Sequence, residues 1–391
     1  MKRRIRRVAL LIESSRNYGR GILRGIARYA HVQGPWSCFT QERELHSGLP
    51  EWLAGWRGEG IIARIEDRRM AAHLCRLGVP VVDVLGQVRH PDIVGFDTDA
   101  EAVAKLAADF FLQAGFRHFA YCGYRGIPFS DRRGEAFAAY LAAQGKGVSE
   151  PHFKPGLDGV THIQAMEQHG LSTQQAIARW LKSLPRPLAL LACNDIRGQQ
   201  VLNACREYGI RVPEDVAVIG VDNDDVLCAL CDPPLTSIEP NTESLGYQAA
   251  ESLDQLMSGQ RPKRIFTLVP PLRLVERAST DLIALEDPVM VEALRFIRSE
   301  VAHKIAVKDV LLHVQRSRTD LENRFRQSLD RTVREEIFRR RMERVCRLLR
   351  ETQLSLEGIA SQAGLNTAAH LCRLFRKHTG QTPSQYRLAA K

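Results

Sequence analysis

Residues suited to contacting nucleic acid lie close together in Ser355–Arg387. One side of a predicted helix carries cations and hydrogen-bond donors, at His370, Arg373, Arg376 and Lys377. The other side carries apolar residues, at Leu371, Leu374 and Phe375. Such a helix can contact phosphates and base edges, so the pattern predicts a helix-turn-helix. An ordinary helical hairpin with a solvated basic face would give the same pattern in a single copy.

A second copy of this pattern occurs in Val307–Leu329. A short apolar helix is followed by SRTDLENRF, where Ser317 and Asp320 resemble a capping box, and Leu321 and Phe325 form an apolar face. Two tandem units could enter successive major grooves, roughly 34 Å apart on one face of DNA. We expect DNA contacts from Arg318, Thr319, Arg324, Asn366, Thr367, His370, Arg373 and Lys377.

Polar residues suited to binding a polyol follow predicted buried strands in the first part of the chain. Planar polar groups make paired hydrogen bonds to neighbouring hydroxyls. Asp222 follows the predicted strand Val216–Val221, a poor place for an unpaired carboxylate, so it contacts a ligand or caps the next turn. Asn194 follows the predicted strand Leu188–Ala192 and contacts a ligand or caps the next helix.

The loop Glu13–Tyr18, after the first predicted strand, supplies two more candidates, Arg16 and Tyr18. The Tyr18 ring could stack on the C–H face of a sugar, or simply pack. Asp97 and Asp99 follow another strand end and are weaker candidates, of which we keep Asp99.

Helix and turn signals position the DNA-contacting residues. Apolar residues recur at helical spacing in Ser355–Ala363, and Gly364 ends that helix because glycine accepts a positive φ. Asn366 or Thr367 is a suitable N-cap for the following helix. Between the two units, apolar residues mark one long amphipathic helix that would fix them rigidly, at Val333, Ile337, Met342, Val345 and Leu349.

The chain before residue 277 alternates short β-branched runs with helical segments. Predicted strands include Val8–Ile12, Gly60–Ile65 and His118–Cys122, and predicted helices include Ala100–Ala114 and Asp195–Tyr208. Near-continuous apolar strands between amphipathic helices predict parallel sheets covered on both faces. About 270 residues exceed one such sheet, so we expect two lobes with a ligand between them, at the carboxyl ends of the strands.

Composition excludes several classes of protein. The 391 residues are 44% hydrophobic and contain no apolar run long enough for a membrane span, and we expect a cytoplasmic protein. Residues 286–391 hold 21 Lys and Arg against 13 Asp and Glu, a net of +8, whereas the other 285 residues have a net of only +2. The excess cations therefore coincide with the predicted helix-turn-helices, as DNA binding requires.

Catalytic and metal-binding patterns are weak. The motifs G-x-S-x-G, G-x-x-x-x-G-K-[ST] and H-E-x-x-H do not occur. Cys228 and Cys231 form a lone CxxC without a second ligand pair at metal spacing. We expect no catalytic residues, no metal and no cofactor.

The C-terminal stretch resembles a family of bacterial transcription regulators. The pattern IAxxxGhxxxxxhxRxFRKxxGxTPSxYR runs from Ile359 to Arg387 and is typical of the DNA-binding domain of the AraC/XylS family. The sequence departs from that family at His370–Leu371, where an aromatic pair is usual, and at Gln315 and Asp330, where glycine is usual.

The first part of the chain resembles the LacI-type sugar-binding core, which is similar to periplasmic binding proteins. The resemblance rests on LACNDIRGQQVLNACREYGIRVPEDVAVIGVDNDD at Leu191–Asp225 and PPLTSIEPN at Pro233–Asn241. It implies that Asp222, Asn194 and Arg133 contact the effector. For Arg133, an ion pair at the surface is the alternative.

Both resemblances together imply an α/β two-lobed sensor domain in residues 1–280, a linker in 281–289 and an all-α tandem helix-turn-helix domain in 290–391. They imply a sugar-responsive transcription activator with D-xylose as its effector, and another pentose or a hexose as the alternative. The implied partners are double-stranded operator DNA, RNA polymerase and a second copy of the chain, in the bacterial nucleoid. A sugar-binding enzyme or transport component with a basic tail is the alternative from a different class.

Overall fold

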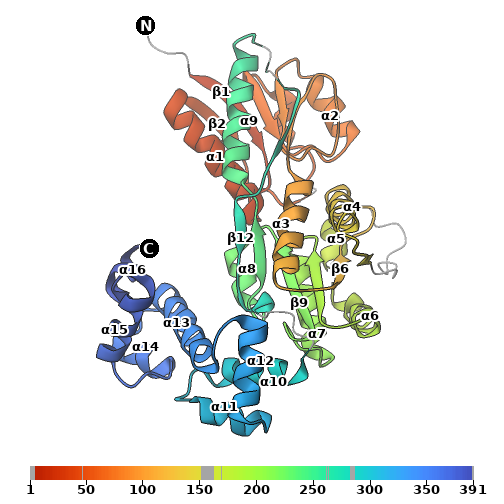
Figure 1. Ribbon diagram of the computed structural model, residues 1–391. Helices are drawn as coiled ribbons and strands as arrows, with labels where there is room; N and C mark the ends of the chain where they lie inside the picture. The colour runs from red at the N-terminus through yellow and green to blue at the C-terminus, as the bar shows by residue number, and fades with distance from the viewer. Residues whose placement is uncertain are drawn as a thin grey trace. The chain divides into compact units, whose positions relative to one another are not determined.

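The computed structural model describes residues 5–45, 47–150, 163–168, 170–260, 262, 264–281 and 287–389. The chain divides into two compact units, Met1–Ala284 and Leu285–Lys391 (Figure 1). Residues 282–286 of the predicted linker lie outside the described residues. No described helix is long and apolar enough to cross a membrane.

The first unit contains two six-stranded sheets, which confirms the predicted α/β two-lobed class. The sheet of lobe 1 has the order β11-β5-β4-β3-β1-β2. Its strands are β1 (Arg6–Leu11), β2 (Trp36–Thr40), β3 (Gly60–Ala63), β4 (Val81–Asp83), β5 (Val94–Thr98) and β11 (Phe266–Val269). All its strand pairs are parallel.

Helices cover both faces of this sheet because its strands alternate between two apolar clusters. In β1, Val8 and Leu10 face one cluster, and Ala9 and Leu11 face the other. Helices α1 (Asn17–Gln33) and α9 (Thr242–Met257) cover the first face, where they lie side by side (Figure 1). Helix α2 (Arg68–Cys75) and the 3-10 helix Glu51–Gly55 cover the second.

The sheet of lobe 2 has the order β12-β10-β9-β8-β6-β7. Its strands are β6 (His118–Cys122), β7 (Val148–Ser149), β8 (Leu188–Ala192), β9 (Val216–Val221), β10 (Thr236–Glu239) and β12 (Arg273–Val275). Only the β10–β12 pair is antiparallel among the described strands. The predicted bounds of β6, β8 and β9 are confirmed to the residue.

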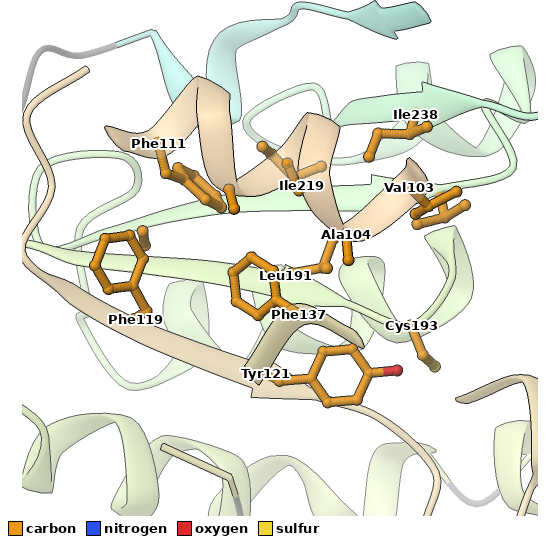
Figure 2. Packing of buried hydrophobic residues seen from close by; sticks show 14 of the residues in the cluster. Val103, Ala104, Phe111, Phe119, Tyr121, Phe137, Leu191, Cys193, Ile219 and Ile238 are labelled. Atoms are coloured by element: carbon orange, nitrogen blue, oxygen red, sulfur yellow. The ribbon is translucent and has the colours of Figure 1, made fainter. Parts of the chain in front are cut away.

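Apolar side chains again cover both faces of the second sheet. Helices α3 (Ala100–Gln113) and α4 (Pro128–Ala142) pack Phe111 and Phe137 against Phe119, Leu191 and Ile219 (Figure 2). The other face is covered by α6 (Gly170–Ser183) and α7 (Asp195–Glu207). The remaining elements of lobe 2 are α5 (Ile163–Gln168), α8 (Asp225–Leu230) and the 3-10 helix η2 (Ala278–Thr280).

The chain passes between the lobes three times. It leaves lobe 1 between β5 and α3, returns between β10 and α9, and crosses again between β11 and β12. Because strands on both sides are parallel, their carboxyl ends meet at the edge of each sheet where these connections begin. That edge is where ligands are expected in such folds.

The second unit is all-α, as predicted. Its helices are α10 (Pro288–Glu300), α11 (Val307–Val314), α12 (Arg318–Leu329), α13 (Val333–Glu351), α14 (Leu356–Gln362), α15 (Ala368–Thr379) and α16 (Pro383–Ala389). Phe325 of α12 and Phe375 of α15 are fully buried, in equivalent places of the two helix-turn-helices. The five predicted apolar positions of α13 are all buried.

Candidate functional site

A cavity in the first unit gathers residues from both lobes at the carboxyl ends of their strands. Lobe 1 contributes Glu13, Arg16, Tyr18, Leu45, Arg64, Leu85 and Asp97. Lobe 2 contributes Phe129, Arg133, Ile163, Asn194 and Asp222. Of the six predicted ligand-binding residues, five line this cavity. A wider opening lined by Ser15, Gln164 and Leu227, among others, shares Arg16, Tyr18 and Asp222 with it.

Asp222 is placed in the cavity by the end of β9. Its backbone has φ 113, in a region that residues with a side chain rarely adopt, and its N–H donates to the Ile238 carbonyl at 3.0 Å. The cap of the following helix α8 is Asp224, which accepts from the Leu227 N–H at 3.1 Å. The capping alternative for Asp222 is therefore wrong. Its carboxylate accepts no hydrogen bond from the residues that the structure describes.

The charge state of Asp222 depends on its surroundings. Burial raises the pKa of the Asp222 carboxyl to about 6, and the guanidinium groups of Arg133 and Arg16 oppose that rise. At neutral pH the group is therefore largely ionised, so both of its oxygens can only accept hydrogen bonds.

Asn194 serves two purposes at the end of β8. Its Oδ1 accepts from the Arg197 N–H at 2.9 Å and caps α7. Its Nδ2 donates to Glu167 Oε1 at 2.8 Å. Both earlier alternatives are therefore compatible with the structure, since the residue is an N-cap and also lines the cavity.

Arg133 is buried rather than a surface residue, so the surface ion pair is excluded. Its Nη1 donates to the Cys193 carbonyl, and its guanidinium carbon lies 5.2 Å from the centre of the Phe129 ring. These two contacts fix the guanidinium beside Asp222 and leave other N–H groups for a ligand.

Arg16 and Tyr18 both have a partner inside the protein. Arg16 forms a bidentate ion pair with Glu167 of lobe 2, with one N–O distance of 3.1 Å. The Tyr18 hydroxyl and Thr98 Oγ1 are 2.9 Å apart, which fixes the ring that lines the cavity. Burial raises the pKa of Tyr18 above its usual range, so the hydroxyl stays protonated.

Asp99 does not line the cavity. Its side chain accepts from the Ala102 N–H at 3.0 Å and caps α3. The neighbouring aspartate on the cavity side is Asp97, which is ion-paired with Arg132 at 2.6 Å. Asp97 lies within β5, whereas Asp99 follows the end of that strand and occupies the N-cap position of α3.

Sequence analysis missed Glu13, Arg64 and Glu167 as individual site residues. Arg64 Nη1 donates to Glu13 Oε1 at 3.3 Å. Glu13 Oε2 and Arg64 Nε are buried and have no hydrogen-bond partner among the described residues. The available signal was their position, since Glu13 and Arg64 follow β1 and β3 as Asp222 follows β9.

The DNA-binding candidates lie at the start of α12 and along α15. Arg318 and Thr319 open α12 and are exposed. Thr367, not Asn366, is the N-cap of α15, because its side chain accepts from the His370 N–H at 3.1 Å. Arg373 and Lys377 are exposed and form no ion pair with the described residues. These positions are open to a nucleic acid.

Arg324 differs from the other candidates. Its Nε donates to Asp320 at 2.9 Å and its Nη1 to Asp287 at 2.5 Å, so it joins α12 to the start of α10. Two of the five N–H donors of this guanidinium are therefore directed to carboxylates within the unit. The sequence pattern placed Arg324 on the outer face but gave no indication of these two acceptors.

Two left-handed turns contain a residue other than glycine. Gln315 (φ 51) ends α11 and Asp330 (φ 52) ends α12, at the two positions where the AraC/XylS family usually carries glycine. The equivalent turns of the second helix-turn-helix contain Gly364 (φ 65) and Gly380 (φ 74). The first helix-turn-helix thus keeps the regular geometry despite its less favourable residues.

Three protein-family models match successive parts of the chain. Residues 7–96 match the XylR N-terminal domain, residues 108–280 a periplasmic binding protein-like domain, and residues 312–389 a helix-turn-helix domain. Among the described residues, no group of three His, Cys, Asp or Glu could hold a metal ion.

The chain is similar over almost its whole length to two curated regulators. The xylose operon regulatory protein of Haemophilus influenzae is 29% identical over 388 residues, which is 98% of each chain. The protein of the same name from Escherichia coli K12 is 29% identical over 97% of this chain and 96% of its own. A solved structure of the xylose-binding transcription activator XylR matches with a TM-score of 0.78 and 28% identity, covering 100% of this chain and 99% of that one.

Proposed function

We propose that this chain, a DNA-binding transcription regulator with a periplasmic-binding-protein-like sensor domain, binds D-xylose and activates genes for xylose uptake and catabolism. The combination of a sensor domain with a helix-turn-helix domain is the arrangement of a ligand-responsive regulator. Its relatives are regulators of this kind rather than enzymes or transport components.

The balanced charge of the cavity is the observation that carries the sugar assignment. Its lining includes three carboxylates, on Glu13, Asp97 and Asp222, and three guanidinium groups, on Arg16, Arg64 and Arg133. A neutral ligand with many hydroxyls can donate to the first set and accept from the second. A charged ligand would leave one set with a buried charge unmatched, which is costly.

The aromatic residues of the cavity also suit a sugar ring. Tyr18 and Phe129 supply apolar surface for C–H groups, and the polar residues supply oriented hydrogen bonds. D-xylose is the first candidate because two relatives carry xylose in their names and the similar solved structure is of a xylose-binding activator. Another pentose or a hexose is the alternative, since the same groups would bind any polyol.

On the DNA side, we infer that α12 and α15 enter successive major grooves of an operator. A homodimer would place two such pairs on adjacent half-sites, and RNA polymerase would be the partner in activation. A sugar can drive this only if it binds more tightly to the DNA-competent arrangement. The protein would then act on the nucleoid in the cytoplasm.

Isothermal titration tests the effector. The full-length protein is titrated with D-xylose, L-arabinose, D-ribose and D-glucose. Heat from D-xylose alone supports the proposal, and heat from another sugar replaces the effector. Absence of binding heat with all four sugars contradicts the assignment of the first unit as a sugar sensor.

Operator binding tests the regulator assignment and its different-class alternative. We expect the operator Kd to change on adding the sugar that binds, and an identical Kd would contradict the coupling. Replacing Arg318 and Arg373 together by alanine should weaken operator binding while leaving sugar binding intact, because both residues are exposed and unpaired among the described residues. If the wild-type protein does not bind DNA, a sugar-binding enzyme or transport component becomes a better hypothesis for its function than a transcription regulator.

A further inference from the structure

The turn that carries Asp222 is held by its next residue, Asn223. Both residues have positive φ, 113 and 44, so the turn persists only because its surroundings hold it. The Asn223 N–H donates to Ser237 Oγ at 3.0 Å. The Asp224 N–H donates to Asp195 Oδ2 at 2.8 Å, and Asp195 Oδ1 accepts from Ser237 Oγ at 2.5 Å. The turn is thus attached to β10 and α7.

Asn223 also accepts a hydrogen bond from the opposite lobe. Asn17, at the start of α1 in lobe 1, donates from Nδ2 to the Asn223 carbonyl at 3.3 Å. Any change in the separation of the lobes therefore acts directly on this turn. The residue before Asn223, Asp222, is the one whose side chain lines the cavity.

Arg277 joins the same turn to the end of the first unit. Its Nη2 donates to Asn223 Oδ1 at 2.8 Å, and its Nη1 donates to the Leu235 carbonyl at 2.9 Å. Its backbone N–H donates to Thr236 Oγ1 at 2.7 Å. One planar guanidinium therefore joins the cavity turn to Leu235, the residue before β10.

The residues that follow Arg277 are the last described ones before the second unit begins. Ser279 and Thr280 are buried, and Ser279 Oγ donates to the Val218 carbonyl of β9 at 2.6 Å. Thr236 Oγ1 lies 2.8 Å from Thr280 Oγ1. The exit segment Arg277–Thr280 is therefore bonded to β9 and β10, the strands that position Asp222.

We propose that Arg277 couples effector binding at Asp222 to the DNA-binding unit, through its hydrogen bond to Asn223. The inference rests on the proposed function and adds to it a positioning residue outside the cavity. A ligand that shifts Asp222 or draws the lobes together displaces Asn223, and the Arg277 guanidinium carries that displacement into the segment from which the chain continues to the helix-turn-helices. Asn17 and Arg277 would then act on one residue from opposite sides.

The coupling ratio tests this inference, defined as the operator Kd without sugar divided by the operator Kd with saturating sugar. Arg277→Met removes the two side-chain hydrogen bonds, to Asn223 and Leu235, and keeps the backbone N–H that donates to Thr236. We expect the ratio to fall at least fivefold towards 1, with sugar affinity changed less than threefold, since couplings of this kind are about 5–150-fold. Asn223→Gly removes the acceptor and accepts the positive φ, and we expect the same loss.

Two further variants separate coupling from a merely structural role. Arg273→Met is the matched control, because Arg273 lies four residues earlier and forms an exposed ion pair with Glu239 at 2.9 Å. It should keep the full ratio. The double variant Arg277→Met, Asn223→Gly should be no worse than either single variant if both act through one hydrogen bond.

Full coupling in Asn223→Gly, with normal sugar binding, would overturn the inference even if Arg277→Met failed to fold. Equal loss of sugar affinity and of thermal stability, with an unchanged ratio, would also overturn it and leave Arg277 a structural residue. Absence of any sugar response in the wild type is a different result, because it removes the proposed function itself.

Discussion

Asp222 differs from its neighbour Asp224 in what its carboxylate contacts. Asp224 caps a helix, whereas Asp222 lies two residues away with its carboxylate directed to the cavity. The chain therefore offers two aspartates in one turn with separate roles, one structural and one proposed to bind the effector. This pairing makes a clean comparison possible.

We expect Asp222→Asn to weaken sugar binding by tenfold or more. A hydrogen bond to a charged group contributes about 1.5–3 kcal/mol, and the amide would accept fewer hydroxyl donors. Asp224→Asn is the control, since asparagine caps a helix about as well as aspartate. Isothermal titration of both variants measures the difference. Equal affinities for the two variants would exclude Asp222 from the site.

Sugar binding should weaken below neutral pH. The pKa of the Asp222 carboxyl is raised to about 6, so protonation of the unliganded protein removes the carboxylate that a ligand would need. At pH 5.5 only about one quarter of the groups are ionised, so we expect affinity about fourfold lower than at pH 7.5. Titrations at both values measure this change, and Asp222→Asn should flatten the profile. If the Kd of the wild type for sugar is the same at both pH values, sugar binding does not need the ionised Asp222 carboxylate.

Much of the cavity was predictable at the residue scale because the carboxyl ends of parallel strands are fixed by the alternation of strands and helices. Asp222, Asn194 and Arg133 were found in this way or through the LacI-type resemblance. Glu167 was not, because it lies on α5 and reaches Asn194 and Arg16 only through tertiary packing. The ion pair of Arg324 with Asp287 was not predictable for a similar reason, since the two residues are 37 positions apart in the sequence.

At the scale of single elements, the helix ends of the second unit show a conflict between sequence and geometry. Gln315 and Asp330 adopt left-handed backbone conformations at the ends of α11 and α12. A side chain in that conformation costs roughly 1 kcal/mol or more relative to glycine. The burial of Val310, Leu321 and Phe325 compensates for this cost.

Gln315→Gly should stabilise the second unit by about 1 kcal/mol, because glycine removes the strain of the left-handed turn. Hydrogen exchange of α11 and α12 in the full-length protein measures the change as slower opening. Gly380→Ala is the converse control and should destabilise by a similar amount, since only φ opposes the methyl group there. Gly364→Ala should cost more, because its Cβ would meet the His303 carbonyl oxygen at 2.2 Å. A loss of protection in Gln315→Gly would contradict this account.

At the scale of the whole molecule, the two lobes are joined by polar contacts around the cavity. Arg16–Glu167 and Arg132–Asp97 each pair one residue of lobe 1 with one of lobe 2. Such pairs contribute little to stability at the surface, and here each of them links one lobe to the other. Their effect should therefore appear in ligand binding more than in unfolding.

We expect Arg132→Gln to lower sugar affinity several-fold although Arg132 does not line the cavity, because Asp97 would lose the cation that offsets its burial. Burial raises the pKa of Asp97, and removing Arg132 would raise it further. Arg6→Gln is the matched control, since Arg6 and Asp254 form a pair of the same 2.6 Å length within lobe 1. Titration and small-angle scattering of both variants measure affinity and lobe separation. Equal sugar affinity and equal lobe separation in the two variants would show that the Arg132–Asp97 pair has no role in sugar binding.

The architecture was predictable from the sequence to a large extent, because apolar strands between amphipathic helices allow few arrangements. The crossings between the lobes were not predictable from periodicity. Helix α9 has the same amphipathic pattern as α3, yet α9 returns to lobe 1 while α3 packs in lobe 2. The lobe against which a helix packs depends on which sheet face is still uncovered. The local sequence pattern of the helix carries no information about that.

The three crossings also determine the order in which the protein can be made. Lobe 1 needs β1–β5, which end at residue 98, and also α9 and β11, which begin only at residues 242 and 266. At about 5–20 residues per second, the sheet of lobe 1 waits on the order of ten seconds or more for the helix that covers it. During that interval the apolar face that contains Val8, Leu10, Ile62 and Val82 lacks the residues that α9 contributes to its cluster. The helix-turn-helix unit, by contrast, is one continuous segment and can fold as soon as it leaves the ribosome.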